Sequence, residues 1–190
     1  MFLPIQDKPK TSNDYSRMAY EFPNLITKEV ATELREFATN TEVSGLHRRN
    51  SKTPAICKAS FYTCLVFHHN HSIYELLDPA WKQFMERVKS DITFIEPYEI
   101  KSYVVGDEFS NHNDVLTSID DITERKMNLI VQLCEEDKYD GGDLMVGPFK
   151  CSRKLGTGIF FPSHYVHSVT PITRGTRFSL VGHAWGPRRI

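Results

Sequence analysis

The clearest indication of the fold is the stretch Phe161-Pro-Ser-His-Tyr-Val-His167-Ser-Val-Thr-Pro-Ile-Thr-Arg-Gly-Thr-Arg177. It reads as a strand over residues 165–170, a turn at Arg174-Gly175 and a strand over residues 177–185. If these two strands are antiparallel neighbours, His167 and Arg177 reach the same cavity. The stretch therefore predicts a strand pair that carries polar side chains into a shared interior.

The chain around this stretch contains further short strands. Apolar runs over residues 98–105, 126–134, 143–146 and 158–161 are separated by turn signals such as Asp140-Gly-Gly142 and Gly156-Thr-Gly158. Short strands at even spacing are typical of a sandwich or a jelly roll. The second half of the chain is therefore predicted to be a β structure.

The first half reads mainly as helices. Thr27 is a candidate N-cap for a helix whose apolar positions recur at helical spacing. Ser72-Ile-Tyr-Glu75 matches a capping box, and Asp78-Pro79 predicts that the helix restarts there with proline in its first turn. An aromatic and β-branched run over residues 61–67 predicts a strand. We therefore expect a mainly β protein with flanking α-helices (α+β). One domain would span residues 1–190, with helical support over 1–95 and a jelly-roll core over 96–190.

Length and composition are those of one globular domain: 190 residues, 40% hydrophobic and 25% charged. The net charge of -1 disfavours nucleic acid as a partner. The apolar N-terminus ends at Gln6, too early for a signal peptide or a membrane span, so we expect a cytoplasmic protein without a membrane partner. No metal-binding spacing relates the cysteines, which we expect to be reduced: Cys57, Cys64, Cys134 and Cys151.

A candidate metal site consists of His112, Asp114 and His167. We expect His112-Asn-Asp114 in a loop directly after the strand at 98–105, and His167 inside a later strand. Two imidazoles and one carboxylate are the donor set of non-haem Fe(II) oxygenases, and they leave three coordination positions open. Two of these can take 2-oxoglutarate and the third O2. An isolated His-x-Asp is common by chance, so an exposed loop pair is the alternative interpretation.

Arg177 strengthens the metal-site interpretation. Its guanidinium presents a planar fork that matches the C5 carboxylate of 2-oxoglutarate, although a lone arginine in a strand is usually a surface ion pair. Ser179 points the same way as Arg177 along a strand and could add a hydrogen bond. On the same face, we interpret His183 as a buried histidine with its hydrogen bonds satisfied. Trp185 is either a core anchor or a wall of the substrate site.

Three segments in the right order resemble the Fe(II)/2-oxoglutarate-dependent dioxygenases. Tyr103-x-x-Gly106-x-x-Phe109-x-x-His112-x-Asp114 resembles the start of the catalytic core in their prolyl 4-hydroxylase-like branch. The block from Arg125 to Asn128, leading into Asp140-Gly-Gly-Asp-Leu144, is similar to the PKHD-type hydroxylases of that branch. The stretch quoted first is similar to the family's closing motif. Together the matches span residues 98–185.

The resemblance implies a double-stranded β-helix core, a cupin-like jelly roll. It implies Fe(II), with 2-oxoglutarate and O2 as cosubstrates and ascorbate as a candidate reductant. It further implies that Tyr103 hydrogen-bonds 2-oxoglutarate, the alternative being an aromatic core residue. Arg125 and Trp185 are candidate substrate contacts. Asn128 and Asp143 stand where the family commonly has Ser or Thr and Glu; we expect neither to affect activity, because neither should touch a ligand.

The leading functional hypothesis is prolyl 4-hydroxylation of a peptide or protein, with release of succinate and CO2. A nucleic-acid oxidative demethylase would use the same iron chemistry, and Arg48-Arg49 is the sole hint of the basic groove it would need. A jelly-roll binding module without turnover is the third hypothesis. Candidate lid segments are residues 40–54 and 115–124.

Overall fold

The computed structural model describes residues 19–40, 47–50, 59–66 and 71–188. The helices are α1 (Lys28–Thr39) and α3 (Ile73–Val88). The strands are β1 (Tyr20–Phe22), β2 (His47–Asn50), β3 (Ser60–Val66), β4 (Phe94–Ile95), β5 (Tyr98–Tyr103), β6 (Phe109–His112), β7 (Thr123–Gln132), β8 (Tyr139–Gly141), β9 (Leu144–Val146), β10 (Phe149–Lys150), β11 (Gly158–Pro162), β12 (His167–Val169), β13 (Ile172–Gly175) and β14 (Arg177–Pro187).

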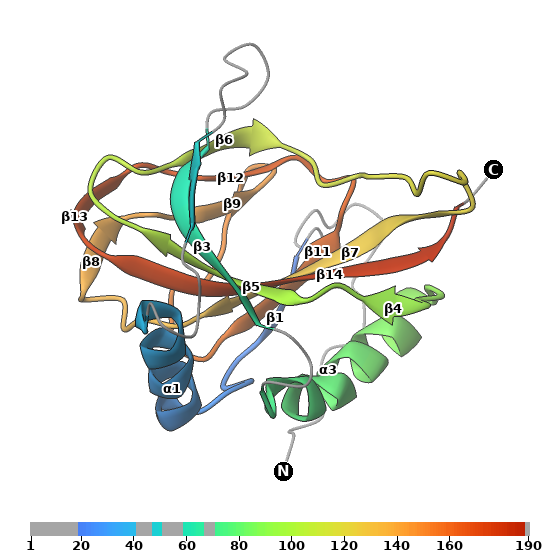
Figure 1. Ribbon diagram of the computed structural model, residues 1–190, viewed down its shortest axis with the longest axis horizontal. Helices are drawn as coiled ribbons and strands as arrows, with labels where there is room; N and C mark the ends of the chain where they lie inside the picture. The colour runs from blue at the N-terminus through green and yellow to red at the C-terminus, as the bar shows by residue number, and fades with distance from the viewer. Residues whose placement is uncertain (1–18, 41–46, 51–58, 67–70, 189–190) are drawn as a thin grey trace.

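Most of these strands form two sheets. The larger has the order β1-β11-β7-β14-β5-β3-β2, with β4 also beside β14, and the smaller has the order β10-β9-β12-β6. All of their pairings are antiparallel. Figure 1 shows the smaller sheet over one face of the larger sheet and both helices on the opposite side. The predicted mainly β jelly roll with flanking helices is confirmed, and four strands from the first 95 residues, β1 to β4, belong to its larger sheet.

The helices cover the larger sheet with an apolar layer. Thr27 caps α1 as predicted, because its side chain accepts a hydrogen bond from the backbone N–H of Val30 at 3.4 Å. Burial of each large apolar side chain in such a layer contributes about 1.5–3 kcal/mol. The layer therefore makes the larger sheet a firm support for the groups on its other face. Its largest buried members include Leu34, Leu77, Trp81, Phe84 and Phe160.

The predicted helix restart at Pro79 is wrong. α3 is continuous from Ile73 to Val88 with Pro79 inside it. Proline lacks the N–H that would bond the carbonyl of Glu75. Helical packing outweighs this loss, because apolar residues on both sides of the proline are buried. The predicted capping box is also wrong, since Ser72 makes no side-chain cap hydrogen bond.

A second layer, between the two sheets, is apolar but carries the polar groups of interest. Side chains alternate along β14. Leu180 and Ala184 belong to the helix-side layer, whereas Val181 belongs to the layer between the sheets. Arg177 and Ser179, four and two residues before Val181, share its face, and both are 1% exposed. One strand thus separates a purely structural core from a polar interior.

Two segments predicted as loops contain strands. His112 ends β6, and it stands directly opposite His167 of β12 in the pairing of these strands. The segment is polar, but backbone hydrogen bonding to β12 makes it a strand whatever its side chains. Residues 47–50, inside the predicted loop 40–54, form β2 and pair with β3. Residues 41–46 and 51–54 of that loop lie outside the described residues.

Within the described chain, neither helix is long and apolar enough to cross a bilayer. Cys64, Cys134 and Cys151 are buried free thiols, and Cys57 lies outside the described residues. Burial raises the pKa of Cys151 to about 12. A thiol in this state forms little thiolate at neutral pH, so Cys151 serves packing and not chemistry.

Candidate active site

Three metal-donor side chains meet between the sheets. Nε2 of His167 is 3.2 Å from Oδ2 of Asp114, and Nε2 of His112 is 3.6 Å from Oδ1 of the same carboxylate. The donor atoms of all three residues lie within 4.8 Å of one another. Two ligands at right angles, each about 2.1 Å from a metal, stand about 3 Å apart. The observed spacing therefore fits one metal ion.

Backbone carbonyls orient both imidazoles. Nδ1 of His112 is 2.8 Å from the carbonyl oxygen of Ser110, and Nδ1 of His167 is 3.1 Å from that of Tyr165. A carbonyl oxygen only accepts, so each Nδ1 carries a proton, and each Nε2 is the nitrogen that can give up its proton and bind a metal. Hydrogen bonds of this kind fix the ring orientation of metal-binding histidines. The two rings are thus held with their metal-binding nitrogens convergent.

A buried amide orients the carboxylate. Nδ2 of Asn128 donates to Oδ2 of Asp114 at 2.9 Å, while Oδ1 of Asn128 accepts from the Ser163 hydroxyl at 3.0 Å and lies 3.0 Å from Nδ1 of His183. The expectation that Asn128 contacts no candidate ligand is therefore wrong. His183, 5% exposed, is the satisfied buried histidine that we predicted.

Burial and neighbouring charges fix the protonation states of the site. Burial lowers the pKa of His112 to about 4, and repulsion from His167 adds to this effect. Burial alone would raise the pKa of Asp114, but its hydrogen bond with His167 and the charges of His167 and His183 hold it below its ordinary value. A neutral His112 and an ionised Asp114 are the forms that bind a divalent metal.

Arg177 is a buried cation at the other side of the cavity. Its Nη1 donates to the Ser179 hydroxyl at 3.2 Å and its Nη2 to Oε1 of Gln132 at 3.1 Å. Among the described residues it has no acidic partner, and its Nε has no hydrogen-bond partner. A buried charge is costly unless it is paired. The position therefore suits an anionic ligand with a planar fork, such as a carboxylate.

The chain makes room for this guanidinium at Gly142. Its φ is +63°, which favours glycine, and a Cβ at this position would stand 2.9 Å from Cδ of Arg177. Tyr103 lies opposite Arg177 in the β5–β14 pairing, with the centre of its ring 5.5 Å from Cζ of Arg177. Burial raises the pKa of Tyr103, so its hydroxyl keeps its proton. A protonated phenol beside a guanidinium can donate to the same anion.

One narrow cavity of about 20 Å³ joins the donor cluster to the guanidinium. His167 and Arg177 both line it, but they reach it from facing sheets, since β12 lies in the smaller sheet and β14 in the larger. The predicted antiparallel pairing of the strands that carry His167 and Arg177 is therefore wrong. The strand between them in the sequence, β13, pairs with β8. The residues around the cavity are Lys101, Tyr103, Phe109, His112, Asp114, Ile130, Leu144, His167, Val169, Arg177, Ser179 and Val181.

The two candidate substrate residues lie together at the far end of β14. Glu96 accepts two hydrogen bonds of 2.7 Å from Arg125 and one from the indole nitrogen of Trp185. The Trp185 ring stacks on Phe94, which is 50% exposed, with ring centres 5.6 Å apart. This end of the strand is therefore partly open to solvent, in contrast to Arg177.

Sequence reasoning missed Gln132, and it undervalued Asn128. Both are almost fully buried and lie on β7. They stand four positions apart in an otherwise apolar run, so strand alternation directs them to the same face. Two polar residues on one face of an apolar strand are a usable signal of a polar interior.

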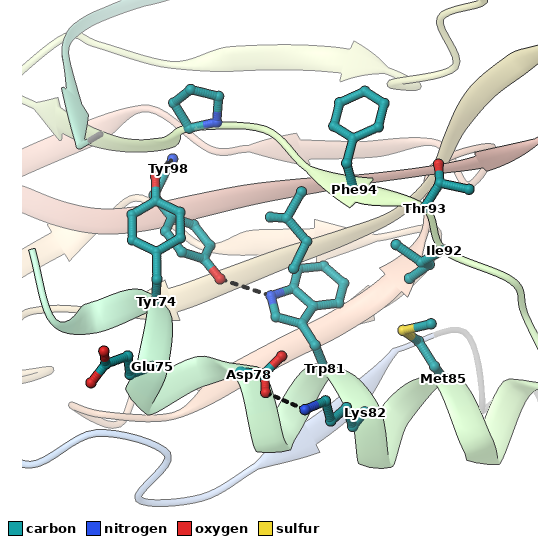
Figure 2. Close-up of a pocket in the computed structure, with 12 residues that line it drawn as sticks. Tyr74, Glu75, Asp78, Trp81, Lys82, Met85, Ile92, Thr93, Phe94 and Tyr98 are labelled. Atoms are coloured by element: carbon teal, nitrogen blue, oxygen red, sulfur yellow. Dashed lines mark hydrogen bonds and ion pairs between the residues drawn. The ribbon is translucent and has the colours of Figure 1, made fainter. Parts of the chain in front are cut away.

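A much larger hollow lies elsewhere, between α3 and residues 92–98. It has a volume of about 820 Å³ and is mostly apolar. Figure 2 shows Trp81 at its base, where the indole donates to the Tyr98 hydroxyl at 2.9 Å, with Met85 and Ile92 at one end. His112, Asp114 and His167, which do not line it, are the one metal-donor group found in the described chain. Size alone therefore does not identify the reactive site.

The sequence profile of the 2OG-Fe(II) oxygenase superfamily matches residues 98–185. A PKHD-type hydroxylase of Burkholderia thailandensis is 25% identical over 179 residues, which cover 84% of this chain and 74% of that protein. The next curated relatives, also PKHD-type hydroxylases, are 29–33% identical, but the alignments cover only 29–50% of their own length.

Two solved structures share the fold. The 2OG complex of the viral collagen prolyl hydroxylase from Paramecium bursaria Chlorella virus-1 superposes with a TM-score of 0.68 and 16% identity. The match covers 89% of this chain and 96% of that one. A prolyl hydroxylase from Trichoplax adhaerens, in complex with a hypoxia inducible factor peptide fragment, gives a TM-score of 0.65 at 15% identity, covering 89% and 84%. At this level of identity the likeness is one of fold.

Proposed function

We propose that the chain is a 2-oxoglutarate- and Fe(II)-dependent dioxygenase of the 2OG-Fe(II) oxygenase superfamily, whose profile matches residues 98–185, and that it hydroxylates a prolyl residue of a peptide or protein. One observation carries the proposal. Three metal-donor side chains and a buried guanidinium without an acidic partner in the described chain line the same cavity. Metal ligands alone would fit many enzymes, but the added carboxylate site fits a 2-oxo diacid.

In this proposal His112, Asp114 and His167 hold the iron. Their donor set leaves open positions for 2-oxoglutarate and O2, and bound Fe(II) supplies the oxidation chemistry. The chain's own contribution is orientation. Carbonyl oxygens hold the two imidazoles, and Asn128 holds the carboxylate through a 2.9 Å hydrogen bond. The donors are thus arranged before the metal binds, which lowers the cost of binding.

Arg177 takes the C5 carboxylate of 2-oxoglutarate. Ser179 and Gln132 keep two of the guanidinium nitrogens in position, at 3.2 and 3.1 Å, and Tyr103 adds a hydroxyl donor. The hydroxylation consumes one O2 and one 2-oxoglutarate. The substrate C–H becomes C–OH, and 2-oxoglutarate becomes succinate and CO2.

Arg125 and Trp185 contact the substrate. They lie side by side on β7 and β14, beyond the residues that line the narrow cavity, and Glu96 bonds both of them. A prolyl ring packs well against an indole face, and a guanidinium can bind a backbone carbonyl of the substrate. Support for a peptide comes from the Trichoplax adhaerens relative in fold, whose structure contains a peptide fragment, and from the PKHD-type relatives in sequence.

The proposal is tested in two steps. Succinate formation is measured with Fe(II), 2-oxoglutarate, O2 and ascorbate, first alone and then with a panel of proline-containing peptides. We expect peptide-stimulated succinate and a gain of one oxygen atom on a prolyl residue, located by mass spectrometry. Stimulation by a methylated oligonucleotide and by no peptide would contradict prolyl hydroxylation.

Asp114→Ala tests the metal site in the same assay. Loss of the carboxylate ligand should reduce succinate to the level without iron. Asp120→Ala is the matched control, because Asp120 is an exposed carboxylate six residues away that accepts hydrogen bonds from the Ser118 hydroxyl and from the backbone N–H of Ile122 in its own turn. If Asp114→Ala forms succinate as fast as Asp120→Ala does, the assignment of Asp114 as a metal ligand is contradicted.

A further inference from the structure

We propose that Lys101 is a second cationic anchor for 2-oxoglutarate, binding its C1 carboxylate, the one beside the oxo group. The inference rests on the proposed function, because it assumes that Arg177 binds the C5 carboxylate. Lys101 lies outside the motifs that the sequence analysis identified, which begin at Tyr103, Arg125 and Phe161. The case for it comes from its location, its contacts, the charge balance of the cavity and the length of the ligand.

Lys101 lies in the middle of β5, within the candidate cavity. It is 7% exposed and lines that cavity together with Arg177 and the three metal-donor residues. In the strand pairing it stands opposite Ser179, two residues along each strand from the pair formed by Tyr103 and Arg177. The ammonium therefore belongs to the polar interior.

The contacts of Lys101 hold its charge only loosely. Nζ is 3.4 Å from Oε2 of Glu99, beyond the 2.7–3.2 Å of a good N–H···O bond. It also lies 4.9 and 5.6 Å from the ring centres of Phe61 and Phe109. An ammonium has three donors, and burying it is costly unless they are used. These contacts leave donor capacity directed at the cavity.

Phe109 shows which end of the cavity Lys101 serves. The ring of Phe109 stacks on His112 with centres 3.7 Å apart, and the same ring is near Nζ of Lys101. Lys101 is therefore on the metal-donor side of Arg177. A cation beside a metal site would repel the metal unless an anion lay between them. The C1 carboxylate of 2-oxoglutarate is such an anion.

The charges of the cavity support this assignment. Among the described residues that line the cavity, Arg177 and Lys101 are the cations and Asp114 is the one carboxylate. The two cations therefore match the two carboxylates of 2-oxoglutarate, while Asp114 serves the metal.

The spacing of the two cations also fits the ligand. Two residues along a strand advance about 6.5 Å, which separates the Lys101 position from that of Tyr103, opposite Arg177. Four C–C bonds of about 1.5 Å place the two carboxylate carbons of 2-oxoglutarate about 5 Å apart. The 20 Å³ cavity is too small for a five-carbon diacid unless wall side chains change rotamer. Lys101 has the flexible stem to move and then close on the carboxylate.

The test is a binding measurement without turnover. The dissociation constant of 2-oxoglutarate is measured calorimetrically with Mn(II) replacing Fe(II) in the absence of O2. Lys101→Met should raise this constant about tenfold or more, as expected for a lost charge-assisted hydrogen bond. Lys82→Met is the matched control, because Lys82 forms an exposed ion pair with Asp78 far from the cavity, and it should change nothing.

A second ligand identifies which carboxylate Lys101 binds. In 2-oxoglutaramate an amide replaces the C5 carboxylate. Lys101→Met should weaken binding of this amide by the same factor as binding of 2-oxoglutarate. Arg177→Gln should weaken binding of the amide far less than binding of 2-oxoglutarate. A Lys101→Met effect that disappears with the amide would place Lys101 at the C5 end and overturn the assignment.

Two further outcomes also overturn it. One is that Lys101→Met leaves the dissociation constant of 2-oxoglutarate unchanged but raises the KM for the peptide, because Lys101 would then bind the substrate. The other is that Lys101→Met leaves this dissociation constant unchanged and lowers the melting temperature, because Lys101 would then only pair with Glu99. If Lys101→Met does not fold, Lys101→Gln is measured by the same criteria. Failure of the wild type to bind 2-oxoglutarate with Mn(II) would instead contradict the proposed function.

Discussion

The two ends of the inner face of β14 are built differently. At one end Arg177 is 1% exposed, and Ser179 and Gln132 bond its guanidinium. At the other end Trp185 is only partly buried and stacks on Phe94, which is 50% exposed. The first end suits one small ligand of fixed shape, and the second suits the variable surface of a larger one. In the proposed function, recognition of cosubstrate and substrate is thus divided along a single strand.

Arg177→Gln should have the largest effect on this division. Losing a hydrogen-bonded charge at the closed end should weaken 2-oxoglutarate binding by about 1.5–3 kcal/mol, or about ten- to 150-fold. Calorimetry measures the change, while the KM for the peptide should hardly move. Arg174→Gln is the control, since Arg174, three residues before Arg177, is an exposed arginine paired with Asp140. Equal effects of the two variants would exclude a cosubstrate role for Arg177.

Asn128→Ala should have the next largest effect, and on the metal. It removes the hydrogen bond that orients Asp114, and loss of such an orienting contact typically costs about 10- to 100-fold in metal affinity. Titration with Mn(II) measures this directly. Gln132→Ala on the same strand face is the matched variant. It should weaken binding of 2-oxoglutarate and leave the affinity for Mn(II) unchanged. A reversed pattern would show that the two functions are not separated along β7 as we describe.

Trp185→Phe should have the smallest effect, limited to the open end. It keeps an aromatic ring but loses the hydrogen bond to Glu96, worth about 0.5–1.5 kcal/mol. The KM for a peptide substrate should rise about two- to tenfold, and the dissociation constant of 2-oxoglutarate should stay constant. A change confined to 2-oxoglutarate would contradict the assignment of the open end to the substrate.

Sequence patterns predicted the features whose cause is local. Thr27 caps α1 because a side-chain oxygen reaches a backbone N–H three residues on. The strand alternation after Arg177 correctly predicted a buried Ser179 and His183. His112, Asp114 and His167 were recognisable because their spacing and residue types follow from the chemistry of a metal site.

Features that depend on distant partners were missed. β6 is short and polar, and it is a strand because β12 pairs with it. Pro79 is a strong local signal for a helix start, yet packing of α3 on the larger sheet overrides it. Lys101 and Gln132 look like ordinary polar residues in the sequence. Only the closure of two sheets around them reveals that they face a common interior.

The depth of Arg177 has a kinetic consequence. Because the guanidinium lies at the buried end and the metal donors lie nearer the solvent, a diacid bound to both fills the inner part of the cavity before anything can occupy the outer part. In the proposed function a peptide seated on Trp185 binds after this diacid. We therefore expect the small acid to arrive first and its shortened product, succinate, to leave last.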